Sequence, residues 1–208
     1  MQTITDKIVS RIYGHGRGWS FSKIDFADIG RAGTVDQALS RLHQRGTIRR
    51  VLPGLYDYPR FSQILNEQAV PDLQMVADAL ARKHRWKIVP DGPTALHVLG
   101  LSEQVPARYR YLSTGPNRVY DIMGRALTFL HRKTQHTALD DEKGALLVQG
   151  VGAVGAGKLS HTQKAHLSKL FKPEEFRRIV KVTASSTAWV HEYIQEIAAL
   201  AQPKERRR

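Results

Sequence analysis

Residues 34–58 constrain the fold more than any other part of the chain, because a helical pattern is followed directly by two strand patterns. Apolar residues recur at helical spacing and would form one stripe: Val35, Ala38, Leu39 and Leu42. Thr34 is a preferred N-cap residue, and Gly46 is a preferred residue just beyond the end of a helix. We therefore expect a helix between Thr34 and Gly46 that buries one face.

A tight hairpin is expected immediately after this helix. Residues 47–52 and 55–58 are short strand-like segments, and the Pro53-Gly54 pair between them is typical of a turn. Arg49 and Arg50 place two cations on the first of these strands. The hairpin would therefore present positive charge beside the helix.

Two further helices are expected upstream. Residues 4–12 carry apolar side chains at helical spacing, and the Gly14-His15-Gly16 segment would end that helix. Residues 21–29 predict a second, short helix with Ser22 near its cap. A helix-turn-helix followed by a basic hairpin is the order of a winged helix-turn-helix, in which the second helix of the pair lies in the major groove of DNA. We therefore expect residues 1–60 to form a winged helix-turn-helix DNA-binding domain.

The predicted outer face of this domain is polar and cationic. Amides, hydroxyls and guanidinium groups are the side chains that read base edges and hold phosphates. The candidate DNA-binding residues are Arg31, Thr34, Gln37, Ser40, Arg41, Gln44, Arg45, Arg49 and Arg50. The alternative interpretation is a small helical domain whose polar face is simply solvated.

The charge balance favours a polyanionic partner. The chain carries 32 Lys and Arg against 19 Asp and Glu, a net charge of +13. Residues 1–60 contribute ten of the basic and five of the acidic residues. An excess of this size favours nucleic acid through the release of counterions, although a basic surface can also serve solubility alone.

Composition excludes several other classes of protein. The chain has no cysteine, which excludes disulfides and thiolate metal sites and fits a reducing compartment. It has no apolar run long enough to span a bilayer, and its first residues lack the apolar region of a secretory signal. We therefore expect a cytoplasmic protein that does not bind membranes.

The rest of the chain predicts an α+β domain. Residues 61–75 are interpreted as a connector, in which Pro71 interrupts any long helix. Residues 76–202 alternate helical and strand-like segments and then become helical, and residues 203–208 form a basic tail. The expected fold class is α+β, with an N-terminal winged helix-turn-helix followed by a mixed α+β C-terminal domain that ends in helices.

Two motifs give the chain a resemblance to a known family. The first is a leucine-containing helix, a glycine, a basic strand and a Gly-Leu-Tyr turn: Leu39, Leu42, Gly46, Arg49, Arg50, Gly54, Leu55 and Tyr56. The second is an Ala-Leu pair, a Gly-Leu pair and a Gln-x-Pro turn: Ala95, Leu96, Gly100, Leu101, Gln104 and Pro106. With these motifs, most of residues 1 to about 135 resemble the AbiEi-type antitoxins of bacterial type IV toxin–antitoxin systems.

The resemblance implies a function and partners. The N-terminal domain would bind inverted repeats of double-stranded DNA in its own promoter and repress transcription. The C-terminal domain would neutralise a nucleotidyltransferase-like toxin without forming a stable complex with it. Apart from the resemblance, we expect a monomer in solution that is not an enzyme and that needs no cofactor or metal.

A glycine-rich segment resembles phosphate-binding loops without completing either pattern. Gly150, Gly152 and Gly155 fit G-x-G-x-x-G, but no second strand with an acidic residue follows at the required distance. Gly157-Lys158 is followed by Leu159, where a P-loop requires Ser or Thr for magnesium. We therefore expect residues 150–157 to be a flexible connector between a strand at 145–148 and a helix.

The enzyme alternative is a metal-dependent nuclease of the PD-(D/E)xK type. Asp91, Asp141 and Lys143 match that short motif, in which carboxylates hold magnesium and the lysine stabilises the transition state. Asp141, however, lies in a turn-like segment, and the motif is common by chance. The simpler interpretation is a solvated acidic turn that caps the next element.

Two pairs of histidines are candidate metal ligands. The pairs are His131 with His136 and His161 with His166, and both have a spacing of five. This spacing does not put two ligands on one helix face, so zinc is not expected. The remaining alternative is a protein-interaction module that docks an acidic toxin directly.

Overall fold

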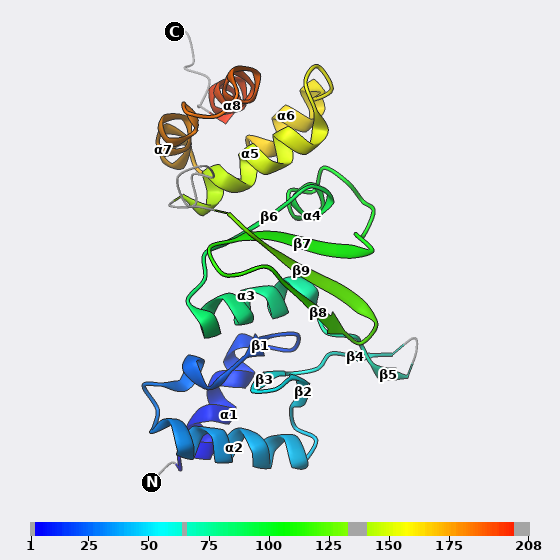
Figure 1. The fold of residues 1–208 in the computed structure, drawn as a ribbon, viewed down its shortest axis with the longest axis vertical. Coiled ribbons are helices and arrows are strands. Elements are labelled where there is room, and N and C mark those ends of the chain that lie inside the picture. The colour runs from blue at the N-terminus through cyan, green and yellow to red at the C-terminus, as the bar shows by residue number, and fades with distance from the viewer. Residues whose placement is uncertain (1–2, 64–65, 133–140, 202–208) are drawn as a thin grey trace, which may run out of the picture. The chain divides into compact units, whose positions relative to one another are not determined.

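The computed structural model describes residues 3–63, 66–132 and 141–201 (Figure 1). The chain divides into two compact units, Met1–Trp86 with Val119–Leu127 and Lys87–Arg118 with Thr128–Arg208. The first unit thus extends past residue 60 and includes a helix that the sequence pattern places in the second domain. No helix among the described residues is long and apolar enough to cross a membrane.

The first unit contains helices, a small sheet and a hairpin. Its elements within residues 1–86 are α1 (Ile4–His15), β1 (Ser20–Phe21), the 3-10 helix η1 (Lys23–Phe26), α2 (Ala32–Gln44), β2 (Arg49–Leu52), β3 (Leu55–Asp57), β4 (Phe61–Ser62), β5 (Glu67–Gln68) and α3 (Leu73–His84). One antiparallel sheet has the order β1-β3-β2, and β4 pairs with β5 in a second one. The expected helix–helix–hairpin order of residues 1–60 is therefore present.

Local sequence signals explain several of the helix ends in the first unit. Thr3 caps α1 through a reciprocal hydrogen-bonded box with Asp6, and Ser22 is the N-cap of η1. The expected cap at Thr34 is wrong, because α2 begins at Ala32 with Arg31 as its N-cap. Beyond the end of α2, Gly46 has a φ of 73°, a conformation in which a side chain would be strained.

The predicted apolar stripe of α2 forms part of the core of the first unit. Buried residues of α1, β1, η1 and α2 pack together with the residue before β2: Ile8, Ile12, Phe21, Phe26, Val35, Ala38, Leu39, Leu42 and Ile48. The rings of Phe21 and Phe26 meet edge to face, with centroids 5.5 Å apart. Burial of this stripe fixes which face of α2 remains exposed.

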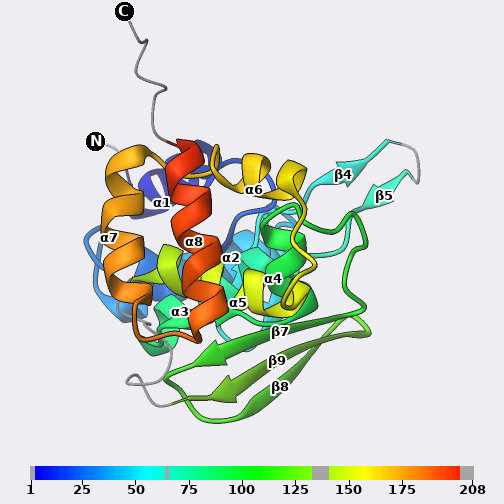
Figure 2. The same cartoon turned by 90° about the horizontal axis from the view of Figure 1, so that it is seen from above.

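The remaining elements confirm a mixed α+β chain that ends in helices. They are β6 (Ile88–Pro90), α4 (Pro93–Val98), β7 (Arg108–Ser113), β8 (Arg118–Ile122), β9 (Arg125–His131), α5 (Glu142–Val154), α6 (His161–Leu167), α7 (Pro173–Thr183) and α8 (Ala188–Ala201). The strands form a sheet of order β6-β7-β9-β8. Helices α5 to α8 pack around one apolar cluster, with α8 beside α7 (Figure 2).

The glycine-rich segment is mostly helix, so two expectations about it are wrong. Residues 145–148 belong to α5 instead of a strand, and α5 continues through Gly150 and Gly152. A Cβ atom on Gly150 would lie 2.1 Å from Cδ1 of Leu99, so this glycine permits a close helix contact. Only residues 155–160 connect α5 to α6, and there the amide of Gly157 donates a hydrogen bond to the hydroxyl of Tyr193.

Candidate nucleic-acid interface

The exposed face of α2 carries a stripe of polar side chains opposite its buried face. Thr34, Gln37, Arg41 and Gln44 follow one another at spacings of three and four residues, which places them on one side of the helix. All four are exposed, and in Figure 1 α2 lies at the outer edge of the first unit. The stripe combines two amides, a hydroxyl and a guanidinium group, a set that can donate to and accept from base edges.

Three more of the predicted residues flank this stripe. Arg31 precedes the first turn of α2, Ser40 lies beside the stripe, and Arg45 is the C-cap residue. Each of the three is exposed. Two cations at the helix ends and a hydroxyl between them suit contacts to phosphates, which fix position without reading sequence.

The two arginines of β2 have different environments. Arg50 is exposed, as expected for a residue that contacts a ligand. Arg49 is not available as a phosphate ligand, because its guanidinium group makes two hydrogen bonds to Asp57 and one to the carbonyl oxygen of Ala69. Asp57 is only 2% exposed, so Arg49 neutralises a buried carboxylate and its expected DNA contact is corrected to a structural role.

Within residues 1–60, every carboxylate has a partner. Asp6 closes the cap of α1, and the other four accept from cations in the pairs Arg82–Asp25, Arg11–Asp28, Lys23–Asp36 and Arg49–Asp57. The hydrogen bonds from Arg11 lower the pKa of Asp28 to about 2. None of the exposed arginines Arg31, Arg41, Arg45 and Arg50 pairs with one of these five carboxylates, so positive charge remains where phosphates could bind.

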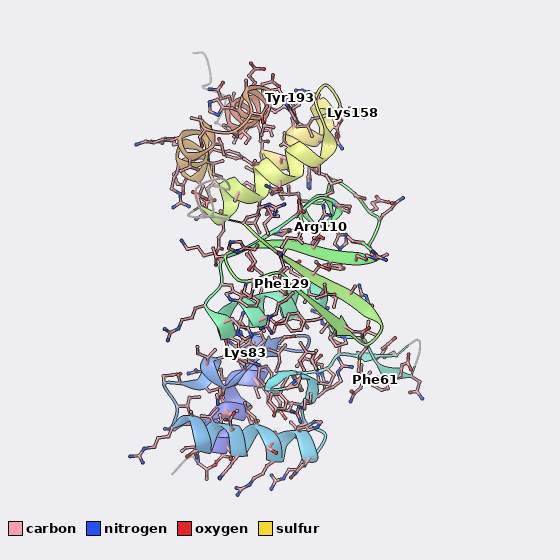
Figure 3. All side chains as sticks on the ribbon, viewed as in Figure 1. Phe61, Lys83, Arg110, Phe129, Lys158 and Tyr193 are labelled. Atoms are coloured by element: carbon pink, nitrogen blue, oxygen red, sulfur yellow. The ribbon has the colours of Figure 1, made fainter. Side chains whose placement is uncertain are left out.

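A pocket of about 710 Å³ lies within the first unit. It is lined by η1, the start of α2, the turn between β2 and β3, and the end of α3, and we name it the η1 pocket. Lys83 of α3, labelled in Figure 3, lines it and donates a hydrogen bond to the carbonyl oxygen of Pro53. Burial lowers the pKa of Lys83, and the nearby charge of Lys23 lowers it further, while Asp36 opposes the shift.

The residues of the nuclease alternative do not form a metal site. Asp91 pairs with Arg110 at 2.7 Å, and Lys143 pairs with Glu175. Asp141 caps α5 and accepts from Nε of Arg178 at 2.5 Å. The parts of the chain that the structure describes hold no group of three or more His, Asp or Glu side chains able to bind a metal.

The histidines have structural contacts. Nδ1 of His131 lies 2.9 Å from the carbonyl oxygen of Gly115, and Nε2 of His166 lies 2.9 Å from that of Leu99. His161 is exposed at the start of α6, and His136 falls outside the described residues. The two predicted pairs therefore give no shared ligand set.

Comparison with known proteins assigns the chain to a protein family. A family model matches residues 7–179 and carries the description "Family of unknown function (DUF6088)". The chain belongs to this family. No curated protein matches it. The crystal structure of the RV2827C protein from Mycobacterium tuberculosis is similar at 16% sequence identity and a TM-score of 0.41, and the match covers 97% of this chain and 78% of that one.

The η1 pocket is the feature of this DUF6088 member that sequence reasoning missed. Lys23 and Lys83 are 60 positions apart and come together only because α3 packs against η1 and β1. The apolar stripe of α3 predicts a helix but not its partner. The sequence contains one signal for the pocket, since Ile24 is an apolar residue between Lys23 and Asp25. In the structure Ile24 lines this pocket and is 37% exposed.

Proposed function

We propose that the first unit is a winged helix-turn-helix that binds duplex DNA in a sequence-dependent manner. The observation that carries this proposal is the exposed amide and guanidinium stripe of α2, together with the exposed Arg50 of the β2–β3 hairpin, whose neighbour Arg49 is paired with Asp57. The element order α1, β1, η1, α2, β2, β3 and the sheet order β1-β3-β2 also support it. In this proposal α2 lies in the major groove and the β2–β3 turn is the wing.

The side chains divide into two roles. Gln37, Arg41 and Gln44 supply the amides and the guanidinium group of the stripe and would contact base edges, Arg41 favouring guanine and the amides favouring adenine. Thr34 at the start of the stripe, the flanking residues Arg31, Ser40 and Arg45, and Arg50 of the wing would hold phosphates. Only the first group should change affinity in a way that depends on base sequence.

We further propose that the chain is an autorepressing antitoxin. The motifs shared with AbiEi-type antitoxins support this step, and the mixed α+β region after the first unit is consistent with a second function. The partner would be a nucleotidyltransferase-like toxin that is neutralised without a stable complex. Elution of the two proteins together from a sizing column would contradict this version and favour direct docking.

The test of DNA binding compares the upstream region of the chain's own gene with a scrambled duplex. Fluorescence anisotropy should show that the double variant Gln37→Ala with Arg41→Ala loses the preference for the native duplex. A matched control is Gln195→Ala with Arg177→Ala, which removes the same side-chain types from exposed positions of α8 and α7. Equal affinity of the unmodified protein for both duplexes would refute sequence-dependent binding.

A further inference from the structure

The η1 pocket has an apolar wall and a cationic rim. Ile24, Ala27 and Gly30 supply apolar surface, and Lys23, Arg31 and Lys83 supply positive charge. Its volume of about 710 Å³ is in the range of pockets that hold small molecules. A ligand that fits would combine a hydrophobic body with an acidic group.

The charges around the pocket are not balanced. Asp36 is the acidic residue of the lining, and its carboxylate is already 2.8 Å from the ammonium group of Lys23. Lys83 donates only to a neutral carbonyl oxygen, and Arg31 is exposed at the edge. A bound anion would therefore meet two cations that form no ion pair within the described part of the chain, Lys83 and Arg31, the first of them half-buried, where charge-assisted hydrogen bonds are strong.

We infer that the η1 pocket binds a small organic anion with an apolar body and that an occupied pocket weakens binding to DNA. The first part stands on the pocket itself, whereas the second rests on the proposed function. Arg31 belongs both to the pocket and to the proposed DNA contacts, so anion and DNA compete for one guanidinium group. Ala32 of α2 and Gly54 of the β2–β3 turn also line the pocket, so the ligand touches both elements that would hold DNA.

Ligand binding is tested on the full chain with 1-pyrenebutyrate, whose fluorescence reports binding. The neutral 1-pyrenebutanol and inorganic phosphate separate the contributions of charge and apolar body. We expect 1-pyrenebutyrate to bind one site per chain, at least about tenfold more tightly than 1-pyrenebutanol, since its carboxylate can accept charge-assisted hydrogen bonds that a neutral hydroxyl cannot match. Inorganic phosphate should bind more weakly than 1-pyrenebutyrate, because it lacks the apolar body.

Two variants locate the site by different means. Ala27→Trp fills the pocket from an exposed position of ordinary helical backbone, and Lys83→Gln removes the charge while keeping a donor for Pro53. Both should weaken 1-pyrenebutyrate about tenfold or more. Ala184→Trp and Lys181→Gln make the same changes at exposed sites of the second unit and should not. Absence of binding, or binding that neither pocket variant weakens, would overturn the site.

The coupling is tested by measuring DNA affinity with and without saturating 1-pyrenebutyrate. The ligand should weaken DNA binding by at least about fivefold in the unmodified protein and should have no effect on Ala27→Trp. Binding of the ligand with unchanged DNA affinity would overturn the coupling alone. Failure to bind DNA even without ligand would instead remove the proposed function, while the fluorescence result on the pocket would stand.

Discussion

Asp57 accepts two hydrogen bonds from the guanidinium group of Arg49, one from Nε at 3.0 Å and one from Nη2 at 2.6 Å. The two residues are opposite each other in the β2–β3 register, and their side chains are 14% and 2% exposed. The pair thus holds the hairpin together from its buried side. Its neighbour Arg50, one residue later on the strand, points to the other face and is exposed.

Removal of one partner of this pair should cost much of the stability of the first unit. Arg49→Ala leaves the buried carboxylate of Asp57 unpaired, and we expect the free energy of unfolding to fall by about 3–5 kcal/mol. Urea denaturation followed by circular dichroism measures this change. Arg50→Ala is the matched control and should stay within about 0.5 kcal/mol of the unmodified protein. A similar loss in both variants would show that the pair has no special role.

The two proposed kinds of DNA contact should respond differently to salt and to sequence. Arg50→Gln removes one phosphate contact, so it should weaken native and scrambled duplexes alike and reduce the slope of log K against log salt by about one. Arg41→Gln should reduce the discrimination between the two duplexes by about 1–3 kcal/mol. Anisotropy titrations over a salt series measure both quantities. A sequence-dependent effect at Arg50 would contradict the assignment of the wing.

Gly150 and Gly152 lie in the same helix but should respond in opposite ways to the same substitution. A Cβ atom at Gly150 would meet Cδ1 of the buried Leu99, so Gly150→Ala should destabilise the chain by about 1–3 kcal/mol through overpacking. Gly152 is exposed, and a Cβ atom added there would meet no atom within 4 Å, so Gly152→Ala should stabilise α5 by about 0.5–1 kcal/mol. Thermal unfolding measures the stability change in both variants. Equal changes would show that the side chain of Leu99 moves aside without cost.

These glycines also show where sequence reasoning reaches its limit. The stripe of α2 and the turn at Pro53-Gly54 were predicted correctly, because each depends on residues that are close in sequence. The helix from residue 145 to Gly152 was not predicted, because a short apolar run fits either a strand or a buried helix. In sequence, a glycine at a helix contact also looks the same as a glycine in a loop. Only the position of Leu99, about fifty residues earlier, distinguishes the two.

In the candidate site, too, features that depend on neighbouring residues could be predicted and features that depend on tertiary contacts could not. The exposed face of α2 could be predicted from helical periodicity alone, and the structure exposes each of its expected residues. Predicting the distinct environments of Arg49 and Arg50 requires the register of β2 against β3, which places Arg49 opposite Asp57. Predicting the η1 pocket requires the packing of α3 against η1, which no local sequence pattern encodes.

The pairing of Arg11 with Asp28 should make the stability of the first unit depend on pH in a defined window. Hydrogen bonds from Arg11 lower the pKa of Asp28 from 3.8 to about 2. A carboxyl group with a lowered pKa in the folded state stabilises the fold above its unfolded pKa, and this stabilisation is lost as the pH falls from about 4 to about 2. Arg11→Leu should return the pKa of Asp28 toward 3.8 and remove this part of the pH dependence.

NMR titration of the Asp28 carboxyl carbon measures the pKa directly, and urea denaturation between about pH 2 and pH 5 measures the linked stability. Arg17→Leu is the control, since Arg17 stacks on Tyr58 and donates to the carbonyl oxygen of Pro59 without touching Asp28. The side chain of Asp28 is 67% exposed, so about 1 M salt should bring its pKa part of the way back toward 3.8. An Asp28 pKa that is the same in Arg11→Leu and in the unmodified protein would show that the ion pair does not persist in solution.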